Sequence, residues 1–170
     1  MEISALPLFR GIAAGELPAL LDRSSAREVR FAKGELLLHR GETPRSLGLV
    51  LEGGVHIIRE DFWGNRSIVG LAGPGEIFAE SYALAGKPLA VSVLAAADGR
   101  ALFLDAGHLS QRLSANLLAL LAEKNLMLTE KMRHMARRTT REQLLPAMEL
   151  LSSYVRVLAP SAEIKSFLVE

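Results

Sequence analysis

Few side chains in this 170-residue sequence have the types and spacing that chemistry requires. The four histidines, His39, His56, His108 and His134, lie far apart, and no H-x-H pair with a nearby carboxylate is present. Metal-dependent enzymes and haem sensors need such clustered or motif-bound ligands. The chain has no cysteine, which excludes disulfides, zinc ribbons, thiol catalysis and cysteine-ligated iron–sulfur clusters. No Ser-His-Asp order, paired-carboxylate motif or P-loop occurs either, so we expect neither an enzyme nor a bound metal or cofactor.

A basic cluster near the C-terminal end is the second chemical feature. It consists of Lys131, Arg133, Arg137, Arg138 and Arg141, with Glu130 and His134 among them. Cations of this kind contact phosphates and support salt-sensitive, non-specific DNA binding. They also complement the negative end of a helix dipole, and we favour this interpretation, a solvated helix end.

The composition fits one folded domain with a short appendage, since 49% of the residues are hydrophobic and 23% are charged. The 20 basic and 19 acidic residues leave a net charge of +1, so no global field attracts nucleic acid. The longest uncharged runs, 88–97 and 113–122, are about half as long as a membrane span. The start, Met1 to Ser4, has neither a basic residue nor a long apolar core. We therefore expect a cytoplasmic protein that does not bind membranes.

Turns divide the first two thirds of the chain into short β-like segments. These segments are 29–31, 35–39, 47–51, 55–59, 66–71, 89–95 and 100–104. Asp98-Gly99, between the last two, is a typical hairpin turn. Short strands at this spacing predict an antiparallel sandwich, jelly roll or barrel.

A long helix is predicted next, because Leu109 to Arg141 contains neither glycine nor proline and is rich in good helix formers. A heptad seam runs along it: Leu118, Leu121, Asn125, Leu128, Met132 and Met135. A polar residue such as Asn125 within a seam fixes the register of a two-stranded coiled coil. We expect the first turns to pack on the sheet and the later seam to pair with the same helix of a second copy. A helix that lies on the β domain throughout is the alternative, because Leu117, Leu120 and Leu126 are apolar too.

Several blocks in a fixed order resemble one known family, the Crp–Fnr transcription regulators. The blocks are Phe31 to Glu35, Arg40-Gly41-Glu42, Leu49 to Val55 and Gly73 to Glu80, with the long helix after them. Leu6 to Ile12 is similar to the helical lead-in of that family, 60–67 to a hairpin of one branch, and 137–145 to the hinge before the DNA-binding domain. The resemblance implies a mainly β fold with α: a double-stranded β-helix (a jelly-roll like the cyclic nucleotide-binding domain), followed by a long dimerisation helix.

The domain division that follows is a sensor roll over 5–108, the dimerisation helix over 109–140, and a short helical tail over 141–170. In the family a winged helix-turn-helix would come after the helix. Pro146 interrupts the resemblance there, and 147–158 fits a single amphipathic helix instead. A truncated or frameshifted regulator and a natural stand-alone module are both left open.

The resemblance also places an effector site in Phe78 to Val93, a segment that we call the cassette. In the family a Gly-Glu pair holds the sugar, a short helix offers N–H groups to the cyclic phosphate, and a buried arginine neutralises that phosphate. Here Glu80 matches the carboxylate, whereas Ala79 replaces the glycine and Leu89 replaces the arginine. The expected effector-binding residues are Glu80, Ser81, Leu89 and Ala90.

The missing arginine decides the expected ligand, because a buried anion without a charge partner costs several kcal/mol. We therefore expect no tight binding of cyclic AMP or cyclic GMP. A pocket for a neutral or apolar effector and a structural relic both remain open, and Glu80 could serve only to cap the following helix.

Trp63, the single tryptophan, lies in the turn 61–65. It could contact a partner subunit, cover the effector pocket, or pack on the sheet beneath it.

The expected function is the sensor and dimerisation portion of a Crp–Fnr-type regulator that responds to an unidentified small effector other than cyclic AMP. It would form a homodimer through the long helix. It would bind DNA only if a helix-turn-helix domain were supplied, with Arg137, Arg138 and Arg141 close to the DNA. The alternative is a stand-alone ligand-binding or interaction module that forms homo- or heterodimers without reading DNA.

Overall fold

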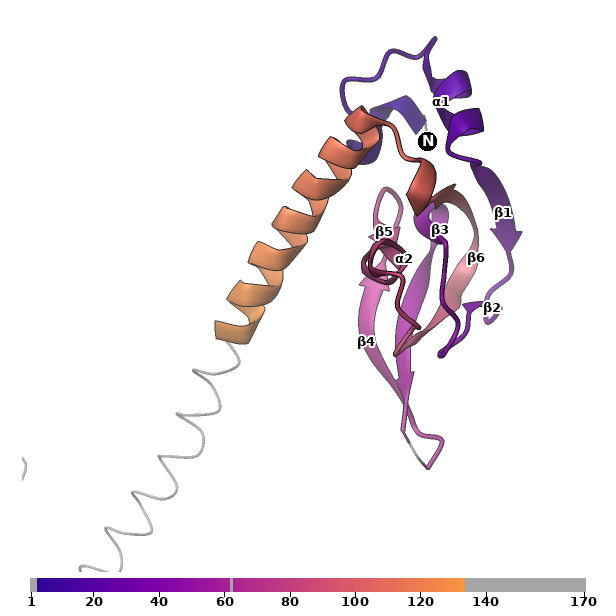
Figure 1. The fold of residues 1–170 in the computed structure, drawn as a ribbon. Coiled ribbons are helices and arrows are strands. Elements are labelled where there is room, and N and C mark those ends of the chain that lie inside the picture. The colour runs from indigo at the N-terminus through magenta and orange to yellow at the C-terminus, as the bar shows by residue number, and fades with distance from the viewer. Residues whose placement is uncertain (1–2, 62, 134–170) are drawn as a thin grey trace, which may run out of the picture. The chain divides into compact units, whose positions relative to one another are not determined.

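Two long antiparallel strands form the centre of the sheet. The computed structural model describes residues 3–61 and 63–133. Strand β3 (Ser46–Glu60) pairs with β6 (Ser92–Asp105). The strands β1 (Arg27–Phe31) and β2 (Leu36–Leu38) pair with β6, and β4 (Arg66–Ala72) and β5 (Ile77–Phe78) pair with β3. The order is β1-β6-β3-β4, with β2 and β5 off this path, and all of these pairs are antiparallel (Figure 1).

Helices lie at both ends of the roll and at one turn within it. Before the sheet come the short helices η1 (Ile3–Ala5) and η2 (Pro7–Phe9) and the helix α1 (Leu17–Arg23). The helix α2 (Glu80–Ala85) follows β5, and η3 (Ala106–His108) follows β6. A long helix then runs from residue 111 to 133, the last residue described. The predicted jelly-roll followed by a long helix is thus confirmed.

The alternation of side chains along β3 and β6 sends apolar residues to two separate clusters. Leu47, Leu49 and Leu51 of β3 join Leu102 and Leu104 of β6 in one cluster. The intervening residues of the two strands face the other way. They join a second cluster that consists of Phe31, Val50, Val55, Ala72, Phe78, Val93, Ala95, Ala101 and Phe103. We call these the helix-side cluster and the cassette-side cluster.

The helix-side cluster is closed by the N-terminal segment and by the start of the long helix. Leu8 and Phe9 of η2 are fully buried in it, as are Leu113 and Leu117 of the long helix. Each such side chain contributes about 1.5–3 kcal/mol when buried. The expectation that the first turns of the helix pack on the roll is therefore confirmed. Residues up to Leu121 form one compact unit, and the described residues from Ala122 onward belong to a second.

The predicted hairpin turn at Asp98-Gly99 is wrong, because β6 continues through these residues without a break. Likewise β3 continues through Gly53. The pairing of the two strands shifts register beside Glu52 and Gly54. A Cβ on Gly53 would overlap the carbonyl of Asp98, and one on Gly99 would overlap the carbonyl of Glu52. The glycines thus serve a close approach of two bulged strands rather than a turn.

Arg100 joins three neighbouring strands on the surface of the sheet. Its guanidinium forms ion pairs with Glu52 of β3 and, at 2.9 Å, with Glu28 of β1. The hydrogen bond from Arg100 lowers the pKa of Glu52 below its usual value. In turn, the hydrogen bonds to Glu52 and Glu28 raise the pKa of Arg100. All three side chains reach solvent, so the network aligns strands more than it adds to stability.

No helix in the described ranges combines the length and the apolar character needed to cross a bilayer.

Replacing Gly48 by alanine should destabilise the roll. Gly48 pairs with Phe78 and Phe103, and a methyl group on it would overlap the ring of Phe78. We expect Gly48→Ala to lower the free energy of unfolding by about 1–3 kcal/mol, in urea titrations followed by far-UV circular dichroism. Gly15→Ala is the control: a Cβ on Gly15 would meet nothing within 4 Å, so the change should stay within about 0.5 kcal/mol. Equal stability of the two variants would contradict the packing argument.

Candidate functional site

The candidate effector segment begins with a left-handed residue. Ala79, directly after β5, has φ 58° and ψ 4°. Glycine occupies this region freely, whereas an L-residue with a side chain does so at a cost of about 1–2 kcal/mol. By its resemblance to the Crp–Fnr pattern, the sequence has Ala79 where that pattern has a glycine. The backbone at Ala79 thus has a conformation that suits glycine, although the residue is alanine.

The helix α2 follows immediately and carries two of the expected site residues. Glu80, its first residue, is only 6% exposed, whereas Ser81 is exposed. A carboxylate in the first turn of a helix interacts favourably with the helix dipole. Gly86, also left-handed, ends the helix, and its N–H donates to the carbonyl of Tyr82.

The strand-like stretch after α2 carries the other two residues and is bound to a neighbouring turn. The N–H of Leu89 donates to the carbonyl of Glu42 at 2.8 Å, and the carbonyl of Leu89 accepts from the N–H of Gly41 at 2.8 Å. The side chain of Leu89 is 2% exposed, and that of Ala90 is exposed. Where the family pattern has a buried arginine, this chain thus holds a buried aliphatic side chain that offers no hydrogen-bond donor.

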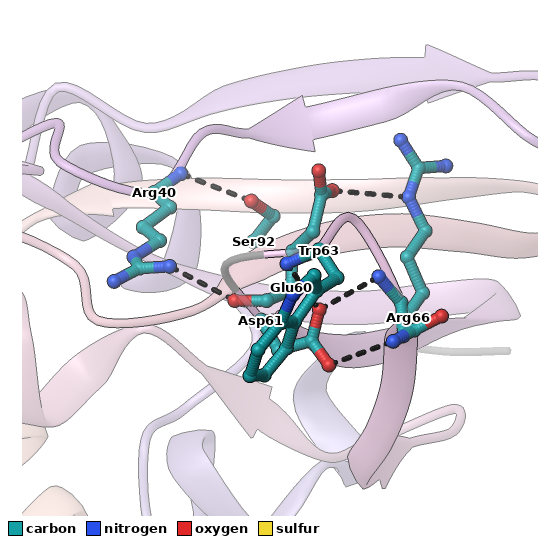
Figure 2. Close-up of polar contacts among 7 residues, drawn as sticks. Arg40, Glu60, Asp61, Trp63, Arg66 and Ser92 are labelled. Carbon is teal, nitrogen blue, oxygen red and sulfur yellow. Dashed lines mark hydrogen bonds and ion pairs between the residues drawn. The ribbon is translucent and has the colours of Figure 1, made fainter.

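Arg40 connects this stretch to the hairpin between β3 and β4. Its backbone N–H donates to the hydroxyl of Ser92 at 3.0 Å, and its guanidinium donates to the carbonyl of Glu60 at 2.9 Å (Figure 2). Three segments that are distant in sequence therefore meet at one residue, Arg40, through its backbone N–H and its guanidinium. These contacts could not be predicted from the sequence, because hydrogen bonds between distant segments leave no motif of their own.

The hairpin is held by its own polar contacts. The carboxylate of Asp61 accepts from the N–H of Trp63 and from both the backbone and side-chain amides of Asn65, each at 2.9 Å (Figure 2). The side-chain hydrogen bond from Asn65, followed by the backbone ones, lowers the pKa of Asp61. Glu60 and Arg66 add an ion pair at 3.1 Å.

Trp63 is 82% exposed, so the interpretation that it packs on the sheet is wrong. A role against a partner or over the pocket stays a prediction.

The predicted helix seam is exposed along most of its described length. Leu118, Leu128 and Met132 are 59–70% exposed, and Asn125 is exposed as well. Leu121 is half-buried against the helix-side cluster. Met135, together with the expected DNA-proximal residues Arg137, Arg138 and Arg141, lies outside the described residues.

Two pockets in the described part of the chain lie away from the cassette. One of about 740 Å³ is lined by residues of β1, β3 and β6, among them Glu52 and Arg100. The other, of about 990 Å³, lies between the N-terminal segment and the start of the long helix. Neither is lined by Glu80, Ser81, Leu89 or Ala90. Sequence reasoning did not identify the larger pocket, because its walls come from segments about 90 residues apart.

Replacing Ala79 by glycine should stabilise the protein. The substitution removes the left-handed strain, about 1–2 kcal/mol, at the entropic cost of a glycine, about 0.5–1 kcal/mol. We expect Ala79→Gly to raise the free energy of unfolding by about 0.5 kcal/mol, measured in urea by circular dichroism. Ala83→Gly, inside α2, is the matched control and should lower it by about 1 kcal/mol. Changes of the same sign in the two variants would refute the strain at Ala79.

Comparison with known proteins agrees with this geometry. The family described as "Cyclic nucleotide-binding domain" matches residues 28–116. The cyclic AMP receptor protein of Thermus thermophilus is 32% identical over 124 residues, which cover 69% of this chain and 56% of that protein. This chain thus spans little more than half the length of that curated relative.

Two crystal structures from the same organism show the corresponding fold. The catabolite activator protein of Thermus thermophilus superposes with a TM-score of 0.51 at 27% identity, over 86% of this chain and 63% of that one. A transcriptional regulator of the CRP/FNR family from Thermus thermophilus superposes with a TM-score of 0.57 at 27% identity, over 65% and 57% of the two chains. At the level of the family, these relatives point to regulators rather than enzymes. The chain belongs to the cyclic nucleotide-binding domain family, and its domain is of the CRP/FNR type.

Proposed function

We propose that this chain is the sensor and dimerisation part of a cytoplasmic transcription regulator of the CRP/FNR type. It forms a homodimer through the long helix and responds to a small effector other than cyclic AMP. The observation that supports this proposal most directly is the apolar seam that the long helix leaves exposed after the sensor roll.

The seam supports pairing of the helix with a second copy. Leu118, Leu128 and Met132 are exposed by 70%, 59% and 66%, at the spacing of a heptad repeat. Exposed large apolar side chains in a row are typical of a protein–protein contact. Each contributes about 1.5–3 kcal/mol when a partner covers it. Asn125, one position of the same seam, favours two strands in a fixed register.

The cassette supports an effector without a buried negative charge. Its turn at Ala79 and its helix α2 retain the backbone form that accepts a ligand. Leu89, however, is a buried leucine at the position of the arginine that would neutralise a cyclic phosphate. A buried anion there would be without its charge partner, at a cost of several kcal/mol. A neutral or apolar effector bound differently by two helix arrangements would be sufficient to shift their populations.

Sequence-specific DNA binding belongs to this proposal only for a chain that includes a DNA-reading domain. A recognition helix in the major groove reads bases, whereas Arg137, Arg138 and Arg141 would contact phosphates. Effector binding would reposition the DNA-binding helices through the long helix.

The helix seam can be tested by one charge substitution. We expect the full chain to sediment as a dimer at about 10 µM, and Leu128→Glu to weaken dimerisation at least about 100-fold, since a carboxylate would be buried at the interface. Leu126→Glu is the matched control: Leu126 is 70% exposed on the same helix but lies outside the seam, so its dimer should persist. A monomer at every concentration, or equal effects of the two variants, would reject the seam.

The effector class can be tested by titration with cyclic AMP. We expect no saturable heat in isothermal titration calorimetry up to about 1 mM nucleotide, corresponding to a Kd weaker than about 1 mM. The cyclic AMP receptor protein of Thermus thermophilus serves as the positive control in the same buffer. Saturation of this chain at micromolar cyclic AMP would overturn the proposal that Leu89 removes the phosphate site.

A further inference from the structure

The larger pocket of the first unit combines charge with apolar surface. It is about 990 Å³ in volume and is lined by the N-terminal segment and by the first turns of the long helix. One wall comes from residues 11–23, which include α1, and the other from residues 110–115. Asn116 holds the walls together, since its side-chain amide donates to the carbonyls of Leu8 and Arg10, each at 2.9 Å. The pocket is therefore formed before any ligand binds.

Two arginines line this pocket from opposite walls. Arg23 ends α1, and Arg112 lies in the first turn of the long helix. Neither guanidinium forms a hydrogen bond or an ion pair with any residue that the structure describes. Glu16 is the one carboxylate in the lining, so the pocket carries an excess of one positive charge. A guanidinium pairs well with a carboxylate through two parallel hydrogen bonds.

The remaining lining is largely apolar. Ile12 and Leu20 line the pocket and also pack against the helix-side cluster. Ala19 on α1 and Ala115 on the long helix add further aliphatic surface on the two walls. Ligand pockets typically combine such apolar lining with a few polar groups that fix orientation.

We propose that this pocket binds a small organic carboxylate with an aliphatic tail, its carboxylate on Arg23 and Arg112 and its tail against Ile12 and Leu20. A single negative charge matches the excess of one positive charge. A phosphate dianion fits less well, because Glu16 would repel its second charge. The site is separate from the cassette and does not depend on the proposed dimer. A ligand bound there would contact both the N-terminal segment and the first turn of the long helix.

Octanoate is a suitable probe, with octanamide as the neutral analogue of the same length. We expect the full chain to bind octanoate with a Kd of about 1 mM or tighter in calorimetry. Octanamide and inorganic phosphate should each bind at least about tenfold more weakly, because one lacks the charge and the other the tail. Arg23→Gln and Arg112→Gln should each weaken octanoate about tenfold, and the double variant should abolish its binding.

Arg10→Gln is the matched control, since Arg10 is an exposed arginine in the same segment that does not line the pocket. It should leave octanoate affinity unchanged. Circular dichroism melts establish that all variants fold. Octanoate binding that is absent up to about 10 mM would overturn the proposal. So would binding that octanamide matches, or binding that the Arg23 and Arg112 variants do not change.

Discussion

The pairing of β3 with β6 is the constraint on which the rest of this structure depends. Because alternate residues face opposite sides, one strand pair supplies both apolar clusters. A shift of the register by one residue would exchange the two sets and leave neither the long helix nor the cassette a surface to pack on. Gly53 and Gly99 let the two strands approach closely where their register shifts, because a Cβ on either glycine would overlap a carbonyl of the other strand.

In the cassette, different residues determine the backbone conformation and the charge. The backbone of Ala79 keeps the left-handed turn, and Gly86 ends the short helix in the same region of φ and ψ. The ring of Phe78, directly before this turn, lies edge-on against that of Phe103, with 5.7 Å between the ring centroids. Leu89 is buried where the Crp–Fnr pattern has an arginine. In the proposed effector site, the shape of the segment and its charge are therefore set by different residues.

The fold could be predicted from the sequence largely because its signals are local. Turn residues, alternating strands and the helix without glycine each act over a few residues, and they predict a sandwich, jelly roll or barrel followed by a helix. The resemblance to the Crp–Fnr family selects the jelly-roll among these folds. The continuity of β6 through Asp98-Gly99 could not be predicted, because it depends on how closely another strand passes. The effector-binding roles of Glu80 and Leu89 stay predictions, made from their positions along the chain. The contacts of Arg40 and the pocket lined by Arg23 and Arg112 could not be predicted, because each brings together segments that are distant in sequence.

The exposed position of Trp63 has a consequence for how this protein can be observed. It is the single tryptophan of the chain, and its side chain is 82% exposed at the tip of a hairpin that is closed by Asp61 and Asn65. Indole emission depends on the water around the ring, which changes little when a side chain that is already hydrated unfolds. The intrinsic tryptophan fluorescence of the chain should therefore change little when the domain unfolds. It should change when another molecule covers the tip of the hairpin.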